Sequence, residues 1–492
     1  MVTELNVTPI TRRRFVQQTV SATAALSGRP TFALAGARWI LGEREQNASP
    51  LDAAAIRKLA SEISGHVITT ESPDYESARL VFNRAFDLRP ALIVRCASSS
   101  DVARALDFAQ SRKSPLAVRG GGHSRAGFGV CDSGVVIDLS GMKRVEVDQS
   151  KRVARAEAGA LVRDLDEVTQ RFGLATTSGG CPNVGLGGFT LGGGEGLLMS
   201  KYGAACDNVL SAYVVTVDGR QMEASQKSNA DLFWAIRGGG GNFGVVTALE
   251  YRLHSVGEVL AGALIYPAAG RIPELLQVFA KFCGSAPDEM VPLGEFLPSN
   301  EGPQFINHVC YLGDPRTGND LLARLRALKP QEEVRAMSYW EAQAAGFAPP
   351  AAPHFQTNLF LRELNEAALA AIATAINDAP PGYRVLIVPF FGAITRVAVG
   401  DMAFALRQTG YEVDVQCRWS APAEKANAEQ WVKALRDNLK PFAQGAYVNQ
   451  LGETSEELVR MSYGPNYARL VEIKKKYDPK NLLRLNQNIR PA

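Results

Sequence analysis

The sequence predicts a mixed α+β fold of two or more domains in which the main chain approaches a ligand closely. Residues 179–196 contain nine glycines in 18 positions, and two further clusters lie at 119–124 and 237–244. Glycine forfeits side-chain burial and costs backbone entropy, so this density indicates backbone pressed against a bound molecule. The second observation is that apparent strands and amphipathic helices follow one another without a regular alternation. Three glycine segments within one such domain predict a large, flat cofactor that carries a diphosphate.

The bulk composition is that of an ordinary globular protein. The chain has 492 residues, of which 46% are hydrophobic and 21% charged. Its net charge of +3 and the absence of a basic stripe argue against nucleic-acid binding. No apolar run approaches the roughly 18 residues of a membrane span. Seven cysteines lack metal-ligand spacing, and their odd number argues against a disulfide framework, so neither a metal nor disulfides are expected.

The amino terminus resembles an export signal rather than part of the fold. Residues 11–16 read TRRRFV, a weakly apolar stretch follows at 19–26, and small residues at 33–37 would suit cleavage. Residues 1–37 are therefore expected to be a twin-arginine signal peptide, which implies export to the periplasm or beyond. The alternative is a disordered basic tail on a cytoplasmic protein, which Arg29 and Pro30 within the apolar stretch would favour.

Residues 50–255 are expected to form the first domain. Apolar periodicity predicts three helices in it, with serines 98–100 offering a cap to the second. Short β-branched runs predict strands, one of which ends in the turn Asp218-Gly219. The expected helices are 56–63, 101–109 and 161–172, and the expected strands are 91–94, 116–118, 135–139, 210–217 and 244–251.

The glycine clusters stop near residue 255, and a second set of elements begins there. Residues 256–445 are expected to form a substrate-binding domain that covers the ligand of the first, and residues 446–492 to return to the first domain. The run Lys474-Lys475-Lys476 is interpreted as a solvated helix end in preference to a binding patch. The expected strands are 260–266, 305–311, 384–391 and 411–419, and the expected helices are 275–282, 321–328 and 364–376.

The glycine clusters match neither a P-loop nor a Rossmann fingerprint. Taken together they resemble the flavin-linked oxidases of the vanillyl-alcohol-oxidase type, specifically the berberine-bridge-enzyme-like branch. The resemblance covers nearly the whole chain after residue 50 in the family's order. The matching segments are RGGGHS at 119–124, CPNVGLGG at 181–188, LGGG at 191–194, DLFWAIRGGGGNFGVV at 231–246, YGPNYARL at 463–470 and KYDPKN at 476–481.

The resemblance implies a PCMH-type FAD-binding domain that the carboxyl-terminal segment completes, with an inserted α+β substrate domain. It also implies bicovalent FAD, with His123 bonded to the flavin 8α-methyl group and Cys181 to flavin C6. The alternatives are a polar loop histidine and an inert buried thiol. The other six cysteines are expected to be core residues.

Dense glycine also brings main-chain N–H groups to an anion without a lysine. By this reasoning and the resemblance, Gly244 and Val246 lie beside the adenine half, and residues 486–488 close over the flavin. The residues expected to contact the cofactor non-covalently are Arg119, Gly120, Gly121, Gly122, Ser124, Gly185, Gly187, Gly188, Gly192, Gly193, Gly244, Val246, Asn486, Gln487 and Asn488.

Residues 411–419, YEVDVQCRW, alternate strictly between apolar and polar. One reading places the polar face in water, whereas the resemblance directs it to the substrate and gives Asp414 the place of the family's catalytic acid or amide. Tyr447 and Asn449 match a Tyr-x-Asn segment beside the flavin, although Gln450 replaces a frequent tyrosine. A tyrosine of pKa about 10 is a poor base near neutrality, so we expect an Asp414–Tyr447 pair to take the substrate proton while hydride passes to flavin N5.

Three further positions concern substrate and oxygen. Glu195 stands where the family frequently has an aromatic residue, and it either binds a polar or cationic substrate or faces bulk water. Val184, three residues after Cys181, leaves oxygen access to the flavin, which favours an oxidase. Gln416 lies on the same strand face as Asp414.

The implied function is a FAD-dependent oxidase that removes hydride from an alcohol or hemiacetal carbon and reduces oxygen to hydrogen peroxide. A carbohydrate and a secondary metabolite fit equally well as substrate. A dehydrogenase of the same fold with another acceptor and a non-catalytic flavin-carrying binding protein are the alternatives.

Overall fold

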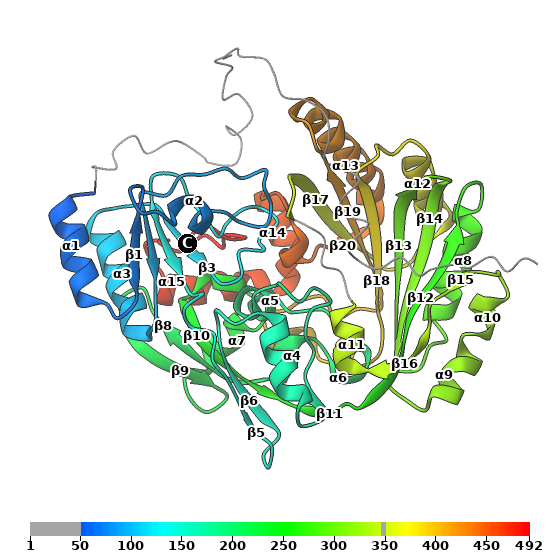
Figure 1. Ribbon diagram of the computed structural model, residues 1–492, viewed down its shortest axis with the longest axis horizontal. Helices are drawn as coiled ribbons and strands as arrows, with labels where there is room; N and C mark the ends of the chain where they lie inside the picture. The colour runs from blue at the N-terminus through cyan, green and yellow to red at the C-terminus, as the bar shows by residue number, and fades with distance from the viewer. Residues whose placement is uncertain (1–50, 346–350) are drawn as a thin grey trace, which may run out of the picture. The chain divides into compact units, whose positions relative to one another are not determined.

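The computed structural model describes residues 51–345 and 351–492 (Figure 1). The expected signal peptide at 1–37 lies outside these residues. The fold is mixed α+β, as predicted, and it contains three principal sheets and one two-stranded pair. No helix in the described part of the chain is long and apolar enough to cross a membrane.

The first sheet has the strand order β1-β2-β4-β3 and carries the first glycine cluster at its end. Strands β2, β4 and β3 are parallel, while β1 is antiparallel to β2. Helix α3 begins after Ser98, whose hydroxyl accepts a hydrogen bond from Asp101 N, so the predicted cap is confirmed. The bounds are β1 His66–Thr69, β2 Leu92–Arg95, β3 Leu116–Arg119, β4 Val135–Asp138, α1 Ala53–Glu62, α2 Tyr75–Ala78 and α3 Ser99–Ser111.

The second sheet is antiparallel, with the order β5-β6-β10-β8-β9. The remaining glycine clusters lie in the segments that connect its strands, where backbone turns are tight. The bounds are β5 Val145–Asp148, β6 Val153–Glu157, β8 Val209–Val215, β9 Gln221–Ser225, β10 Val245–Arg252, the pair β7 Leu174–Ala175 and β11 His254–Ser255, and helices α4 Val162–Gln170, α5 Leu186–Leu191, α6 Met199–Tyr202 and α7 Ala230–Ile236.

The third sheet is large and antiparallel, with the path β15-β12-β14-β13-β18-β19-β17-β20 and β16 paired to β12. Helices α8, α12 and α13 cover one of its faces (Figure 1). The strands are β12 Glu258–Pro267, β13 Met290–Ser299, β14 Gly302–Tyr311, β15 Gln331–Glu332, β16 Arg335–Ser338, β17 His354–Leu361, β18 Tyr383–Phe390, β19 Gly410–Arg418 and β20 Ala443–Gly445. The helices are α8 Ile272–Cys283, α9 Pro315–Leu321, α10 Ala323–Arg326, α11 Tyr339–Ala344, α12 Glu366–Asn377 and α13 Lys425–Leu439.

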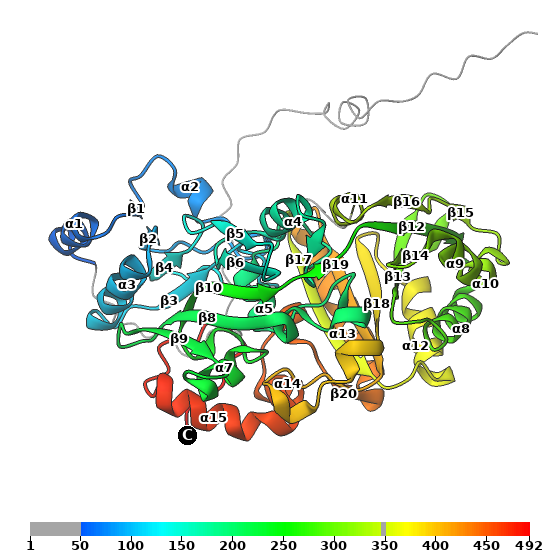
Figure 2. The same cartoon turned by 90° about the horizontal axis from the view of Figure 1, so that it is seen from below.

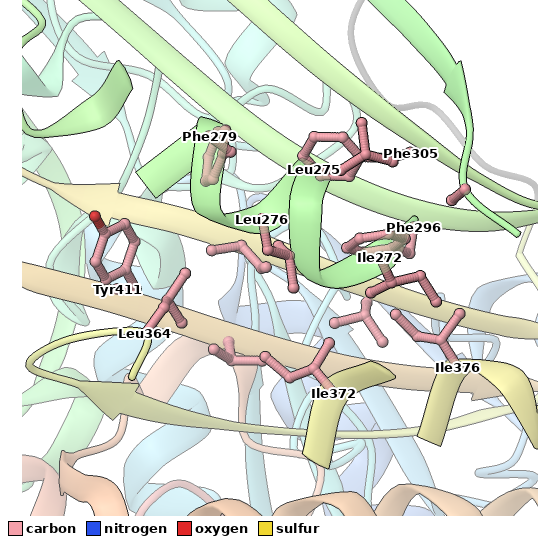
Figure 3. Packing of buried hydrophobic residues seen from close by; sticks show 14 of the residues in the cluster. Ile272, Leu275, Leu276, Phe279, Phe296, Phe305, Leu364, Ile372, Ile376 and Tyr411 are labelled. Carbon is pink, nitrogen blue, oxygen red and sulfur yellow. The ribbon is translucent and has the colours of Figure 1, made fainter. Parts of the chain in front are cut away.

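The helix-covered face of this sheet holds the largest apolar core. Figure 3 shows Leu275, Leu276 and Phe279 of α8 in one apolar cluster with Ile372 and Ile376 of α12 and with strand residues such as Phe296 and Phe305. The apolar residues of β19 at 411, 413, 415 and 417, and Trp419 just after the strand, belong to this core, which confirms the predicted apolar face. Strand alternation therefore turns the polar residues of β19 to the opposite face.

Two central strands of this sheet were not predicted. Strand β13 contains Pro292, Gly294 and Pro298, which are breaker signals in sequence. In the first part of strand β17, Phe355 is the one apolar residue among His354, Gln356, Thr357 and Asn358, and these four polar residues are all buried. Burial on both faces removes the amphipathic signal that marks a half-exposed strand.

The carboxyl-terminal segment returns to the first half of the chain. Helices α14 (Glu456–Tyr463) and α15 (Tyr467–Tyr477) supply Tyr463, Leu470 and Ile473 to the core that contains Leu232 and Phe233 of α7. Figure 2 shows α15 lying along α7.

The lysine run at 474–476 is not simply a solvated helix end. Lys474 is completely buried, and its Nζ donates to Asp478 Oδ2 at 2.7 Å, Asn242 O at 2.9 Å and Leu483 O at 2.8 Å. The interpretation holds for Lys475, which is exposed, whereas Lys476 pairs with Asp231. Because Asn242 belongs to the third glycine cluster, Lys474 connects that cluster to the carboxyl-terminal segment.

We predict that Lys474→Ala lowers the free energy of unfolding by about 3–5 kcal/mol, because it leaves Asp478 buried without its counter-charge. The exposed Lys475→Ala is the matched control and should change stability by less than about 0.5 kcal/mol. Urea unfolding followed by circular dichroism measures both. Equal stability of the two variants would contradict the structural role assigned to Lys474.

Candidate functional site

One cavity of about 740 Å³ lies between the glycine clusters and the polar face of the large sheet. Its walls come from all three glycine clusters, from strands β13, β18 and β19, and from residues 447–451 and 483–487. Most residues predicted to contact the cofactor line it; Gly192, Gly193 and Asn488 do not. Segments distant in sequence therefore converge on one chamber.

The glycines of this cavity leave main-chain N–H groups free to bind a ligand, and they leave space that side chains would otherwise fill. The main-chain N–H groups of Gly120, Gly121 and Gly122 make no hydrogen bond to other main-chain groups of the described chain. Side chains added at Gly180, Gly188 and Gly241 would project into open space within the cavity. The result is a cradle of free amide donors and bare backbone, suited to a flat molecule with an anionic group.

Gly192 and Gly193 were also predicted to contact the cofactor, but they do not line the cavity. Their N–H groups donate to Gly188 O and Thr190 O. A side chain at Gly192 would overlap Asn449 Oδ1 at 2.0 Å, and Gly193 has a φ of +127° against Phe404. These two glycines are required for close packing of the chain on itself.

His123 lies in the cavity wall as a neutral imidazole. Its ring stacks on Phe82 with ring centroids 4.0 Å apart, and Nδ1 is buried without a hydrogen-bond partner. Burial, followed by the positive charge of Arg125, lowers the pKa of His123 to about 3. An uncharged imidazole with a free nitrogen has the electron pair that a nucleophile needs.

Cys181 also lines the cavity and is only partly buried. The other six cysteines are buried, as predicted, and they form no disulfide with one another. Burial raises the pKa of Cys131 and Cys310 to about 12. Cys181 is thus the one thiol in the described chain that faces the cavity.

The carboxyl-terminal segment presents amide oxygens that lack donors. Three side-chain oxygens of this segment are buried without a hydrogen-bond partner: Asn486 Oδ1, Gln487 Oε1 and Asn488 Oδ1. Arg119 Nη1, a donor in the first glycine cluster, is also buried without a partner. Asn486 and Gln487 line the cavity, together with Ser124, Gly244 and Val246. Buried polar atoms are nearly always hydrogen-bonded, so these atoms indicate a bound molecule with both donors and acceptors.

The polar face of β19 points to this site and not to water. Glu412, Asp414 and Gln416 are each at most 2% exposed. Gln416 lines the cavity, and its Nε2 donates to Gln356 Oε1 at 2.7 Å. Asp414 lies one layer behind the wall, where burial raises its pKa to about 6 against the opposing effect of Arg384.

The predicted Asp414–Tyr447 pair is not formed. Asp414 accepts from Gln356 Nε2 at 2.8 Å and from Arg384 Nη1 at 3.5 Å. The Tyr447 hydroxyl accepts instead from Gly194 N at 2.9 Å and from Asn449 Nδ2 at 2.8 Å. Asp414 therefore pairs with Arg384. Glu412, two positions earlier on the same face of β19, and Glu195 are the carboxyls that act on Tyr447.

The carboxyls beside Tyr447 are Glu195 and Glu412. Glu195 is enclosed rather than in bulk water, and it lines the cavity next to Tyr447. Burial, followed by the charge of Glu195, raises the pKa of Tyr447 well above its usual value. Tyr447 is therefore a neutral phenol at physiological pH and is not suited to act as a proton-accepting tyrosinate.

Glu195 and Glu412 contact each other as a carboxyl pair. Treated as carboxylates, Glu195 Oε1 and both oxygens of Glu412 would be buried without any donor. A protonated Glu412 removes the conflict by donating to Glu195, and this contact raises the pKa of Glu412 in addition to burial and the charge of Glu195. Burial raises the pKa of Glu195 to about 8, so the pair is kept uncharged near neutrality.

Glu412 was missed in sequence, although the alternation that selected Asp414 also places Glu412 on that face. Its partner Glu195 lies more than 200 residues away, and no spacing pattern connects them. Arg125, Arg384 and Arg418 also line the cavity and were not predicted. Val184 and Asn449 lie in the wall, with Asn449 Nδ2 also donating to Phe189 O at 2.9 Å.

Comparisons with known proteins agree with this architecture. Residues 90–225 match the FAD-binding-domain family model, and residues 446–490 match the model described as berberine and berberine-like. The oxidoreductase YgaK of Bacillus subtilis, an uncharacterised FAD-linked protein, is 30% identical over 88% of this chain and 98% of its own length. The (R)-6-hydroxynicotine oxidase of Paenarthrobacter nicotinovorans is likewise 30% identical, over 88% of this chain and 99% of its own.

Solved structures show the same fold. The crystal structure of 6-hydroxy-D-nicotine oxidase from Arthrobacter nicotinovorans superposes with a TM-score of 0.79 at 29% identity, covering 87% of this chain and 98% of the other. The xylooligosaccharide oxidase of Myceliophthora thermophila gives a TM-score of 0.82 at 23% identity, with 89% and 99% covered. The second likeness concerns the fold alone.

The residues present fit FAD. The free amides of Gly120, Gly121 and Gly122 suit its diphosphate, and the bare backbone at Gly180 and Gly188 accommodates a flat ring system. The unpartnered amide oxygens of Asn486 and Gln487, which line the cavity, could accept hydrogen bonds from groups such as ring N–H and ribose hydroxyls. FAD is thus the cofactor that the family match, the cradle and the orphaned polar atoms agree on.

We predict that the Glu195–Glu412 pair makes the protein less stable as pH rises. Because the pKa of Glu195 is raised from 4.5 to about 8, the folded state holds a proton that the unfolded chain releases. Stability should fall between about pH 4.5 and pH 8, by up to about 1.4 kcal/mol per pH unit. Thermal unfolding of the FAD-loaded protein across this range measures it. Glu195→Gln should flatten the dependence and the exposed Glu363→Gln should not; an unchanged slope in Glu195→Gln would refute the assignment.

Proposed function

Since the chain belongs to the berberine-bridge-enzyme-like family of FAD-linked oxidoreductases, we propose that it is an oxidase with flavin held covalently by both His123 and Cys181. Its proposed substrate is an alcohol or hemiacetal carbon of a carbohydrate or secondary metabolite, with oxygen as the final acceptor. The observation that carries the proposal is that a neutral imidazole, an accessible thiol and Glu195, one carboxyl of a buried pair, border one cavity.

The two side chains are suited to covalent attachment for different reasons. His123 presents an unprotonated nitrogen, and its stacking on Phe82 holds the ring in one orientation. Cys181 is the cavity-facing thiol, and Arg125 lines the same cavity. Each bond would replace one hydrogen of the cofactor and one hydrogen of the side chain, and the two electrons and two protons released would pass to oxygen to give hydrogen peroxide.

When bound, FAD supplies the two-electron acceptor for oxidation of the substrate carbon and transfers those electrons to oxygen. The chain's own task is to receive the proton of the substrate hydroxyl. Glu195 lines the cavity, and in its ionised form it can take that proton at its carboxylate. Glu412 keeps its own proton and donates a hydrogen bond to Glu195, which stabilises the carboxylate before transfer.

Tyr447 and Asp414 take supporting roles in this proposal. Tyr447 accepts two hydrogen bonds, from Gly194 N and Asn449, so only its own O–H remains to be donated to the substrate or to Glu195. Asp414 balances the charge of Arg384 behind the wall. Val184 lines the cavity, as does Cys181, and it is the residue that we expect to leave a path for oxygen to the flavin.

We predict that the purified protein retains its yellow colour in the pellet after acid precipitation. His123→Ala and Cys181→Ala should each keep one linkage, with a different absorbance spectrum, and the double variant should release all flavin. His66→Ala, on the exposed end of β1, is the matched control and should retain both linkages. Flavin found wholly in the supernatant of the unaltered protein would reject covalent attachment.

We further predict that Glu195→Gln slows anaerobic flavin reduction by about a hundredfold or more, the usual contribution of a positioned base. In the unaltered enzyme the rate should rise with pH toward about 8, because the proton acceptor is the ionised form of Glu195. Stopped-flow absorbance with a substrate found by screening for hydrogen peroxide tests both. Glu363→Gln serves as control, and a Glu195→Gln variant with normal rate and pH profile would exclude Glu195 as the base.

A further inference from the structure

Three arginines line the substrate side of the cavity, from three separate segments. Arg125 follows His123 after strand β3, Arg384 lies on β18, and Arg418 ends β19. Antiparallel pairing of β18 with β19 sets Arg384 opposite Gln416, two residues before Arg418. The sheet and the loop after β3 thus bring three positive charges to one region of the wall.

The three arginines differ in what neutralises them. Arg384 Nε donates to Glu295 Oε1 at 2.5 Å, and its Nη1 lies 3.5 Å from Asp414 Oδ2. Arg418 Nε donates to Gln416 Oε1 at 3.3 Å, and Arg125 Nε donates to Gln450 Oε1 at 3.1 Å. Within the described chain neither Arg125 nor Arg418 forms an ion pair with a carboxylate.

The amide contacts orient both guanidinium groups. Gln416 and Gln450 occupy the Nε position of Arg418 and Arg125, so the terminal nitrogens remain for another partner. Those nitrogens are not enclosed by protein, unlike Arg119 Nη1. Arg125 is also fixed over the Phe82 ring, 5.6 Å from its centroid. Two pre-oriented donor groups therefore face the cavity.

Holding these charges together costs free energy in the absence of a ligand. Burial and then the neighbouring Arg384 lower the pKa of Arg418. Burial likewise lowers the pKa of Arg125, with Arg384 and Arg418 adding to the effect and Asp414 opposing it. A fold that keeps two half-buried guanidinium groups without counter-charge is expected to gain the missing charge from what it binds.

The local charges leave room for one anion. The three guanidinium groups face two carboxylates, Glu295 and Asp414, and within the described residues neither Glu195 nor Glu412 forms an ion pair with them. Glu295 also contacts His308 at 2.9 Å, so it is already engaged twice. One additional negative charge in the cavity would balance the site.

We propose that Arg418 and Arg125 form a binding subsite for a carboxylate group of the substrate, so that the enzyme acts on acidic alcohols or sugar acids in preference to their neutral counterparts. This inference rests on the proposed function for its substrate class, but binding itself does not require turnover. Guanidinium groups bind carboxylates through two parallel hydrogen bonds, which gives orientation as well as affinity. Leu293, Leu297 and Leu386 of the same wall would contact the apolar part of the molecule.

Equilibrium binding to the oxidised, FAD-loaded enzyme tests the subsite, with flavin absorbance as the signal. The probes are two pairs that differ only in charge: D-glucuronate with D-glucuronamide, and benzoate with benzamide. We expect at least one carboxylate to bind ten times more tightly than its amide, and the preference to shrink as salt is added. In Arg418→Gln the preference should fall to about twofold or less, while Arg418→Lys should retain part of it.

The control variant is Arg396→Gln, an exposed arginine paired with Asp288 outside the cavity, which should keep the full preference. If Arg418→Gln fails to incorporate flavin, Arg125→Gln decides, with the same expected loss. Equal affinity for acid and amide in both pairs, no binding of either carboxylate, or an undiminished preference in the arginine variants would each overturn the proposal. Carboxylate preference without any hydrogen peroxide production would uphold the subsite and count against the oxidase function.

Discussion

The buried ammonium of Lys474 is the interaction on which the cofactor half of the structure depends. It joins the carbonyl of Asn242, in the third glycine cluster, to Asp478 and to the carbonyl of Leu483. The side chains of Asn486 and Gln487 follow only a few residues later, in the cavity wall. This contact holds the carboxyl-terminal segment against the third glycine cluster, although the two are more than 200 residues apart in the sequence.

The second organising constraint is the parity of the large sheet. Odd-numbered residues of β19 enter the apolar core beneath α8, α12 and α13, while even-numbered residues face the cavity side. Full burial of that polar face means that every charge on it must find a partner or lose its charge. Asp414 and Arg384 use the first solution, and Glu195 with Glu412 uses the second. The same constraint leaves Arg125 and Arg418 dependent on what enters the cavity.

Much of the fold was predictable because its signals are local. Helix α3 carried a serine cap and apolar periodicity, and strand β19 carried strict alternation, so both were recognised with nearly the right bounds. Strands β13 and β17 were missed because prolines interrupt one and buried polar residues disguise the other. In the site, His123 and Cys181 stand within recognisable glycine-rich segments. The Glu195–Glu412 contact, the partners of Tyr447 and the buried state of Lys474 arise from tertiary packing, which leaves no spacing in the sequence.

The separation of the large sheet into two faces also bears on how this scaffold can change. A substitution at an even position of β19 alters hydrogen bonding or charge in the chamber but touches none of the side chains that anchor the helices. The odd-numbered residues of β19 pack in the apolar core, where a change in side-chain volume would be destabilising, and they need not be altered. New selectivity can therefore be introduced at alternate positions without repacking the apolar core, provided that each buried hydrogen-bond or ion-pair partner is changed together with the residue it contacts. To change the substrate selectivity of such an enzyme, the even-numbered positions of β19 are therefore the ones to vary.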